Sequence, residues 1–235
     1  MEERYRFLKS MLLPALFVAL LWALKGAEDF AYLNLDGWGN YPRTASGMLG
    51  IVASPFVHGD IGHLTSNSFP ILLLGSLIFF FYPIAAPRVI LGIYLLTGVS
   101  VWLFARPVYH IGASGLVYGF AFFLFFSGVV RNDMKSLAIS FFIIFMYGGI
   151  VWGLLPNLIG ISWETHLFGA VAGSLFAYLF RNFDLQPKEL WSFDDETQPA
   201  INYRYIYVPK EKPLALPAPE ESKPITDEKG VEENM

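Results

Sequence analysis

Long apolar segments recur along this chain and restrict what it can fold into. Hydrophobic residues make up 54% of the sequence, a larger share than an ordinary soluble domain contains. Each apolar segment is about as long as the run of residues with which a helix crosses the hydrocarbon core of a bilayer. The sequence therefore predicts an all-α membrane protein whose six transmembrane helices cover about residues 8–25, 63–82, 88–105, 113–130, 136–154 and 163–180.

Turn-forming and charged residues lie where the apolar segments stop. Pro83 and Pro87 separate the second segment from the third, and Arg106 with Pro107 closes the third. Pro156 lies between the fifth and the sixth. Because proline interrupts helices and marks turns, these positions agree with a count of six helices.

Lysine and arginine are divided unevenly between the two sides of the predicted bundle. Their excess normally lies on the cytoplasmic side of a membrane protein. Both termini are therefore expected in the cytoplasm, most simply of a cell membrane, and the second, fourth and sixth helices then begin outside. One side carries Arg4, Arg6, Lys9, Arg88, Arg131, Lys135, Arg181 and Lys188, and the other carries Lys25, Arg43 and Arg106.

The chain divides into a membrane domain at residues 1–183 and a tail at residues 184–235. The tail is rich in Pro, Glu, Asp and Lys, so it is predicted to be mostly disordered and cytoplasmic. Within it, residues 202–208 are a candidate short strand or interfacial patch. In the membrane domain, residues 26–62 form the longest external connection and are expected to lie on the membrane surface.

Composition also excludes several kinds of function. The sequence has no cysteine, which excludes disulfides, thiolate catalysis and cysteine-based metal sites. No basic cluster with interleaved aromatic residues indicates a nucleic-acid partner. The net charge of -4 comes from the acidic tail and says little about partners.

Three polar residues are predicted to lie at one depth, at the outer ends of three helices. His63 begins the second helix, Ser114 begins the fourth, and His166 lies near the start of the sixth. A serine hydroxyl is a weak nucleophile, and a neighbouring neutral imidazole can take its proton. Histidines also gather at helix ends for no catalytic reason, and His110, four residues before Ser114, is a second candidate base.

Glycines spaced four apart occur in the same two helices as Ser114 and His166. Small residues at this spacing let membrane helices approach closely, and they also serve ordinary bundle packing. His166 shares a helix face with the glycines that follow it. If the two glycine faces meet, Ser114 and His166 come within hydrogen-bond reach. The glycines are Gly115 and Gly119 in the fourth helix, and Gly169 and Gly173 in the sixth.

His63 and Asn67 are four residues apart and share one face of the second helix. Both can donate hydrogen bonds to the oxyanion that develops during acyl transfer. The alternative is that Asn67 caps or bridges helices. No carboxylate is placed to orient His166, because Glu164 lies on a different face and is expected to be solvated. A Ser-His dyad is therefore favoured over a triad.

In this order, the motifs resemble those of the rhomboid family of intramembrane serine proteases. The resemblance covers about residues 8–182, and the six-helix count fits the family's minimal form. One departure is that Gly47-Met48-Leu49-Gly50 stands where many members have a structural Trp-Arg pair, so the packing of the first external loop is in question. The matching motifs are Ser54–Asp60 leading into His63-x-x-x-Asn67, Gly112-Ala113-Ser114-Gly115 followed by Tyr118, and His166-x-x-Gly169-x-x-x-Gly173.

The resemblance implies a fold, an activity and a set of site residues. Ser114 would be the nucleophile, His166 the base, and His63, Asn67 and Ser114 the oxyanion donors. Tyr118 would pack against the His166 ring, supported by Gly112, Gly115, Gly119, Gly169 and Gly173. The reaction would hydrolyse peptide bonds in or near transmembrane segments of proteins that enter from the lipid, without a metal or cofactor. The alternative is a non-catalytic rhomboid-like protein that binds or escorts membrane clients.

Overall fold

A computed structural model describes residues 2–131, 133–156 and 162–185, and all structural statements below refer to these residues. They form helices and no β-strand. The predicted tail lies almost entirely outside them, as does the candidate strand at 202–208. The long helices are α1 (Glu2–Phe30), α3 (Ile61–Phe81), α4 (Ala86–Phe104), α5 (Ser114–Arg131), α6 (Met134–Tyr147) and α7 (Trp163–Leu179).

Most of these helices have the length and composition of membrane spans. Five apolar segments qualify clearly, namely α1, α3, α4, α5 and residues 134–154, where α6 continues into the 3-10 helix η4 (Gly148–Leu154). The 17 residues of α7 rise about 26 Å, close to the shortest transmembrane helix. The prediction of an all-α, multi-pass membrane bundle with about six helices is confirmed.

The first helix is longer than its apolar segment. It was predicted to end near residue 25 but continues to Phe30. Lys25 forms ion pairs with Glu28 at 3.1 Å and with Asp29 at 3.0 Å, three and four residues further along the helix. Such pairs support helix beyond the hydrocarbon, where hydropathy alone gives no signal.

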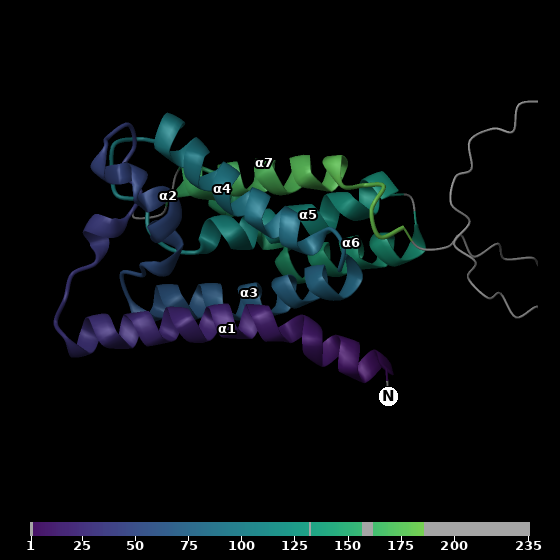
Figure 1. The fold of residues 1–235 in the computed structure, drawn as a ribbon. Helices are drawn as coiled ribbons and strands as arrows, with labels where there is room; N and C mark the ends of the chain where they lie inside the picture. The colour runs from purple at the N-terminus through teal and green to yellow at the C-terminus, as the bar shows by residue number, and fades with distance from the viewer. Residues whose placement is uncertain (1, 132, 157–161, 186–235) are drawn as a thin grey trace, which may run out of the picture. The chain divides into compact units, whose positions relative to one another are not determined.

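Four short helices fold the connection between α1 and α3 at one end of the bundle (Figure 1). A Cβ added to Gly47 would lie 1.9 Å from the Tyr41 carbonyl oxygen, and one added to Gly50 would lie 2.3 Å from Asn40 Cα. The chain therefore packs against itself at these glycines, and the loop is folded without a Trp-Arg pair. The short helices are η1 (Asp36–Trp38), η2 (Ser46–Met48), α2 (Gly50–Ala53) and η3 (Ser54–Phe56).

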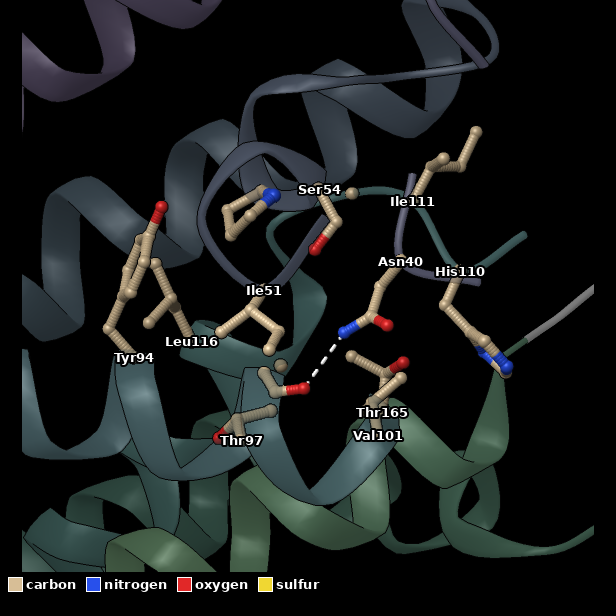
Figure 2. A pocket seen from close by; sticks show the side chains of 14 residues that line it. Asn40, Ile51, Ser54, Tyr94, Thr97, Val101, His110, Ile111, Leu116 and Thr165 are labelled. Carbon is tan, nitrogen blue, oxygen red and sulfur yellow. Dashed lines mark hydrogen bonds between the residues drawn. The ribbon is translucent and has the colours of Figure 1, made fainter. Parts of the chain in front are cut away.

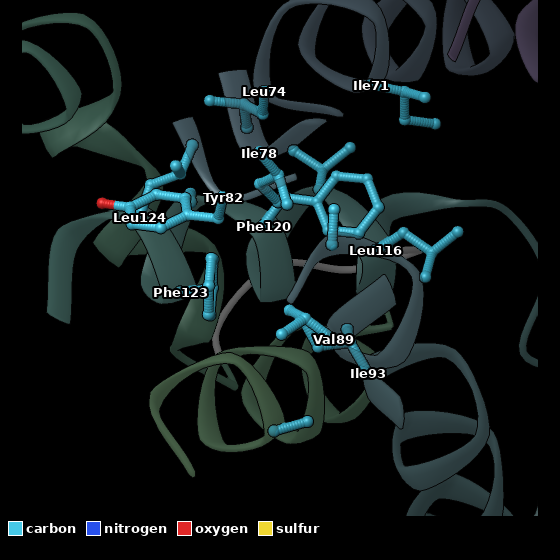
Figure 3. Close-up of a cluster of buried hydrophobic side chains, with 14 of the residues drawn as sticks. Ile71, Leu74, Ile78, Tyr82, Val89, Ile93, Leu116, Phe120, Phe123 and Leu124 are labelled. Carbon is cyan, nitrogen blue, oxygen red and sulfur yellow. The ribbon is translucent and has the colours of Figure 1, made fainter. Parts of the chain in front are cut away.

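Helix α5 is the central element and packs against α3, α4, α6 and α7. The largest group of buried apolar side chains surrounds it (Figure 3). Dispersion contacts of this kind hold membrane helices together, because lipid tails are as apolar as the side chains. The core thereby fixes α5, which carries Ser114. The labelled members are Ile71, Leu74, Ile78, Tyr82, Val89, Ile93, Leu116, Phe120, Phe123 and Leu124.

The backbones of α5 and α7 touch where the glycine faces were predicted to meet. A Cβ added to Gly169 would lie 2.2 Å from the Gly115 carbonyl oxygen. One added to Gly173 would lie 2.1 Å from the Gly119 carbonyl oxygen. Neither position has room for a methyl group, so the contact depends on glycine. It brings the start of α7 against the start of α5.

Candidate active site

Ser114 and His166 face each other across the contact between α5 and α7. Ser114 is the first residue of α5, and His166 lies in the first turn of α7. Ser114 Oγ lies 2.9 Å from His166 Nε2, a normal hydrogen-bond distance. His166 is buried, whereas Ser114 is partly exposed. The arrangement is that of a hydroxyl with a base beside it.

The His166 ring is held by a backbone carbonyl and by an aromatic face. His166 Nδ1 lies 2.9 Å from the Gly153 carbonyl oxygen, which can only accept. We therefore assign the proton to Nδ1, and this leaves the Nε2 lone pair free to accept the Ser114 hydroxyl proton. Tyr118 stacks on the ring at 4.1 Å with an interplanar angle of 8°, and its hydroxyl donates to the Ile150 carbonyl oxygen.

The turn before Ser114 requires glycine for two reasons. Gly112 has a φ of +97°, a conformation that side chains disfavour. A Cβ there would also lie 2.5 Å from His63 Nε2, so the imidazole of His63 lies directly against this backbone. The Gly112 N–H donates to the Ser54 carbonyl oxygen at 2.9 Å. The segment that begins at Ser54 thus supports the turn that presents the serine.

His63 and Asn67 lie together on α3, although no described hydrogen bond joins Asn67 to Ser114. Asn67 is buried, and its Nδ2 donates to the His63 carbonyl oxygen at 3.1 Å. An amide has a second hydrogen, which leaves Asn67 one further donor. The Asp60 side chain accepts from the His63 backbone N–H at 2.8 Å and caps α3. Sequence spacing alone placed Asp60 in the preceding loop.

His58 is a part of this site that spacing did not single out as a functional residue. It is 1% exposed, its ring centre lies 5.0 Å from that of His63, and its Nε2 accepts from the Ala113 N–H at 3.4 Å. Burial, with a smaller effect of His63, lowers the pKa of His58 to about 4. The ring is therefore neutral near pH 7, as an accepting nitrogen must be.

The expectation that Glu164 is solvated is wrong. Its side chain is buried and its carboxylate lies 3.1 Å from Arg106 Nε. Arg106, just beyond the end of α4, pairs with Glu164 Oε1, whereas Oε2 is buried without a partner among the described residues. Spacing could not predict this pair, because the two residues are 58 positions apart. The pair ties α7 to the segment after α4 and leaves no described carboxylate on His166 Nδ1.

His110, the second candidate base, is engaged elsewhere. Its Nε2 lies 3.0 Å from the Arg106 carbonyl oxygen, and its Nδ1 contacts Ser162 Oγ. Burial lowers the pKa of His110, so this ring too is neutral near pH 7. One ring nitrogen therefore bonds within the loop that precedes Ser114 and the other contacts the N-cap residue of α7, so neither is engaged with the serine.

A small cavity of about 20 Å³ adjoins Gly112 and Gly115 (Figure 2). Asn40 Nδ2 donates to the Gly98 carbonyl oxygen at 2.8 Å, the bond that is dashed in the figure. Asn40 Oδ1 and Thr97 Oγ1 are buried without a partner among the described residues. A polar cavity of this size can hold one water molecule. The backbone around the serine thus borders a polar recess inside an apolar bundle.

More than half of the chain matches a known protein family. A family model described as "Rhomboid domain" matches residues 45–183. An uncharacterised protein of Mycobacterium tuberculosis (strain H37Rv) is 35% identical over 172 residues, which is 69% of this chain and 72% of that protein.

Two further relatives extend the comparison. An uncharacterised protein of Mycobacterium leprae is 32% identical over 188 residues, 76% of this chain and 74% of that protein. A protein of Acanthamoeba polyphaga mimivirus, whose name gives it a provisional rhomboid assignment, is 27% identical over 60% of this chain and 80% of its own length. Because the family model covers more than half of the sequence, the chain belongs to the rhomboid family.

Proposed function

We propose that this protein is an intramembrane serine endopeptidase that cleaves other membrane proteins in or near their transmembrane segments. The observation that carries the proposal is the 2.9 Å contact between Ser114 Oγ and His166 Nε2. The Nδ1 contact with Gly153 supports it, because it selects the tautomer in which Nε2 accepts a proton.

The proposed reaction has two halves. In the first, Ser114 Oγ attacks the scissile carbonyl carbon while His166 Nε2 takes the hydroxyl proton. The tetrahedral intermediate collapses when His166 gives this proton to the leaving nitrogen and the C–N bond breaks. In the second half, His166 takes a proton from water, whose oxygen attacks the acyl-enzyme. The ester bond then breaks, and the proton returns to Ser114.

The oxyanion of each intermediate needs donors beside Ser114. The first N–H groups of α5 lack partners within the helix, and the positive end of the helix dipole lies there. We propose that the Ser114 N–H acts together with the His63 ring and the Asn67 amide. One such donor is typically worth about 2.7–4 kcal/mol of transition-state stabilisation.

The test compares wild type with Ser114→Ala and His166→Ala on a panel of single-span substrates in liposomes. We expect each variant to insert and purify normally but to lose cleavage. Ser174→Ala is a matched control, because Ser174 bonds within α7 to the Ala170 carbonyl oxygen and should be dispensable. Turnover retained by Ser114→Ala would refute the assigned nucleophile.

A fluorophosphonate probe separates a protease from a non-catalytic protein that escorts membrane clients. We expect labelling of wild type and of Ser174→Ala, and none of Ser114→Ala. Folded wild-type protein that binds transmembrane substrates but is neither labelled nor able to cleave them would favour the escort function instead.

A further inference from the structure

A second, much larger cavity lies on the other side of α5 from His166. Its volume is about 690 Å³, within the range of sites that hold a drug-sized organic molecule. Helix α1 packs on α3, whereas α4 packs mainly on α7, so α1 and α4 diverge and the cavity lies between them. Residues of α3 and α5, including Ile71 and Phe120, form its floor.

The lining of this cavity suits hydrocarbon. Tyr94 carries the one polar side chain among the lining residues, and its hydroxyl already donates to the Val52 carbonyl oxygen. Water in a cavity needs two to four polar partners, which these walls do not offer. In a protein that crosses the bilayer, the available apolar occupant is a lipid acyl chain.

The cavity runs along the helix axes. On α1 its lining extends from Leu13 to Leu20, a rise of about 10 Å, and on α4 from Pro87 to Leu95, a rise of about 12 Å. Val52 and Phe56, from the folded connection after α1, also line it, and the Phe56 ring lies 5.5 Å from that of Phe17 on α1. An extended chain parallel to the helices fits this shape.

Two basic residues stand at the end where α1 and α4 both begin. Lys9 lies four residues before Leu13, and Arg88 lies three before Leu91, so each shares a helix face with a lining residue. Both side chains are exposed, and Arg88 uses one of its five N–H donors on the Ile84 carbonyl oxygen. Two cations beside an apolar cavity match the phosphate and acyl chain of an anionic phospholipid.

We infer that the cavity between α1 and α4 binds one acyl chain of an anionic phospholipid, with the headgroup phosphate between Lys9 and Arg88. The inference is separate from the proposed proteolysis, since neither basic residue nor the cavity contacts Ser114 or His166. Binding is therefore measured in Ser114→Ala as well as in wild type, so that a failure of either proposal is visible by itself.

The test is native mass spectrometry of purified protein with equal amounts of phosphatidylglycerol and phosphatidylcholine. We expect wild type to retain phosphatidylglycerol preferentially. Each basic residue near a membrane surface contributes about fivefold in affinity for anionic lipid, so Lys9→Gln/Arg88→Gln should reduce the preference about 25-fold. The control Arg4→Gln/Arg181→Gln removes the same charge from the same end and should keep the preference.

A second variant tests the acyl-chain site itself. Leu16→Trp fills the cavity from α1 and should lower retention of both lipids while thermal unfolding stays near that of wild type. An equal loss of preference in the Lys9/Arg88 and Arg4/Arg181 variants would overturn the headgroup assignment. Unchanged lipid retention in Leu16→Trp, or displacement of phosphatidylglycerol by a client transmembrane peptide, would overturn the acyl-chain site.

Discussion

At the scale of single residues, the backbone carbonyl of Gly153 orients His166, the candidate base. A Cβ added to Gly153 would lie 1.9 Å from the Tyr118 hydroxyl oxygen and 3.2 Å from His166 Nδ1. We therefore expect Gly153→Ala to displace the Tyr118 and His166 rings. A displacement of about 1 Å at a catalytic group can cost about 100-fold in rate, so kcat/KM for a transmembrane substrate should fall between 10- and 100-fold.

Gly149 provides the matched control for Gly153. It lies in the same 3-10 helix, and a Cβ added there meets nothing within 4 Å. Gly149→Ala should keep kcat/KM within about twofold of wild type. Equal losses in both alanine variants would mean that η4 needs flexible backbone rather than the Gly153 contact with His166.

The buried imidazole of His58 should make the stability of the folded protein depend on pH. Its pKa is about 4 in the folded protein, against about 6.5 when unfolded, so the unfolded chain binds the proton more readily. The neutral His58 ring makes its full contribution to the free energy of unfolding above pH 6.5, and this contribution is lost as the pH falls towards 4. The loss is about 3 kcal/mol.

The measurement is the free energy of unfolding in detergent micelles at pH 7 and pH 4. His58→Gln keeps an acceptor for the Ala113 N–H but does not titrate, so its decrease should be about 3 kcal/mol smaller than that of wild type. Parallel pH profiles for the two proteins would contradict the buried neutral state of His58.

Side-chain chemistry could be predicted from sequence at this scale, but backbone contacts could not. The alternating direction of the helices placed Ser114 and His166 at one end of the bundle, and the glycine faces of their two helices predicted that they pair. The Gly153 carbonyl and the Arg106–Glu164 pair were missed. Every residue has a backbone carbonyl, so the sequence does not show which one contacts His166. The pairing of Arg106 with Glu164 depends on how the segment after α4 meets α7 in space.

At the element scale, the glycine contact between α5 and α7 sets the distance between Ser114 and His166. Gly173→Ala would place a methyl group 2.1 Å from the Gly119 carbonyl oxygen, so the helices must separate. We expect a loss of about 1–3 kcal/mol in the free energy of unfolding, the usual cost of overpacking, together with reduced cleavage.

Gly26→Ala is the control for this contact. Gly26 lies in α1, where an added Cβ meets nothing within 4 Å. Since alanine favours helix over glycine by about 0.8–1.0 kcal/mol, this variant should be equally or more stable than wild type. A decrease of the same size in both variants would show that the loss in Gly173→Ala does not come from the α5–α7 contact.

Helix existence was predictable at this scale, whereas some helix ends were not. Hydropathy located every long helix because a bilayer imposes one length on all of them. It missed the extension of α1 to Phe30, which ion pairs support, and the change from α6 to the 3-10 helix η4 after Tyr147. Both features depend on local contacts that carry little hydropathy.

At the scale of the whole molecule, a polar clasp closes the end of the bundle where α5 and α7 finish. Arg131 donates to the carbonyl oxygens of Phe180 and Phe183, and its guanidinium lies 4.5 Å from the centre of the Tyr82 ring. Asp184 accepts from the backbone N–H groups of Ile84 and Ala85 at 3.0 and 2.9 Å. The clasp therefore joins the ends of α3, α5 and α7 to the turn that begins α4, at the level where the predicted tail begins.

The clasp refines the charge argument for orientation. Arg131 is buried in it, so this residue adds less to the surface charge of its side than the sequence count assumed. On the opposite side Arg43 bonds to the carbonyl oxygens of Leu103 and Ala105, and Arg106 pairs with Glu164. Even with Arg131 left out, the side with the N-terminus keeps the larger number of basic residues.

We therefore propose that both termini lie in the cytoplasm of a cell membrane. Green fluorescent protein fused after Met235 or before Met1 should fluoresce, because it matures in the cytoplasm. Alkaline phosphatase fused after Val108, in the loop before Ser114, should be active, because it folds outside. The reverse pattern would mean that the whole protein is inverted in the membrane, with Ser114 facing the cytoplasm and the Lys9–Arg88 pair facing outside. The candidate active site would then open to the cytoplasm, and the lipid headgroup would have to come from the outer leaflet.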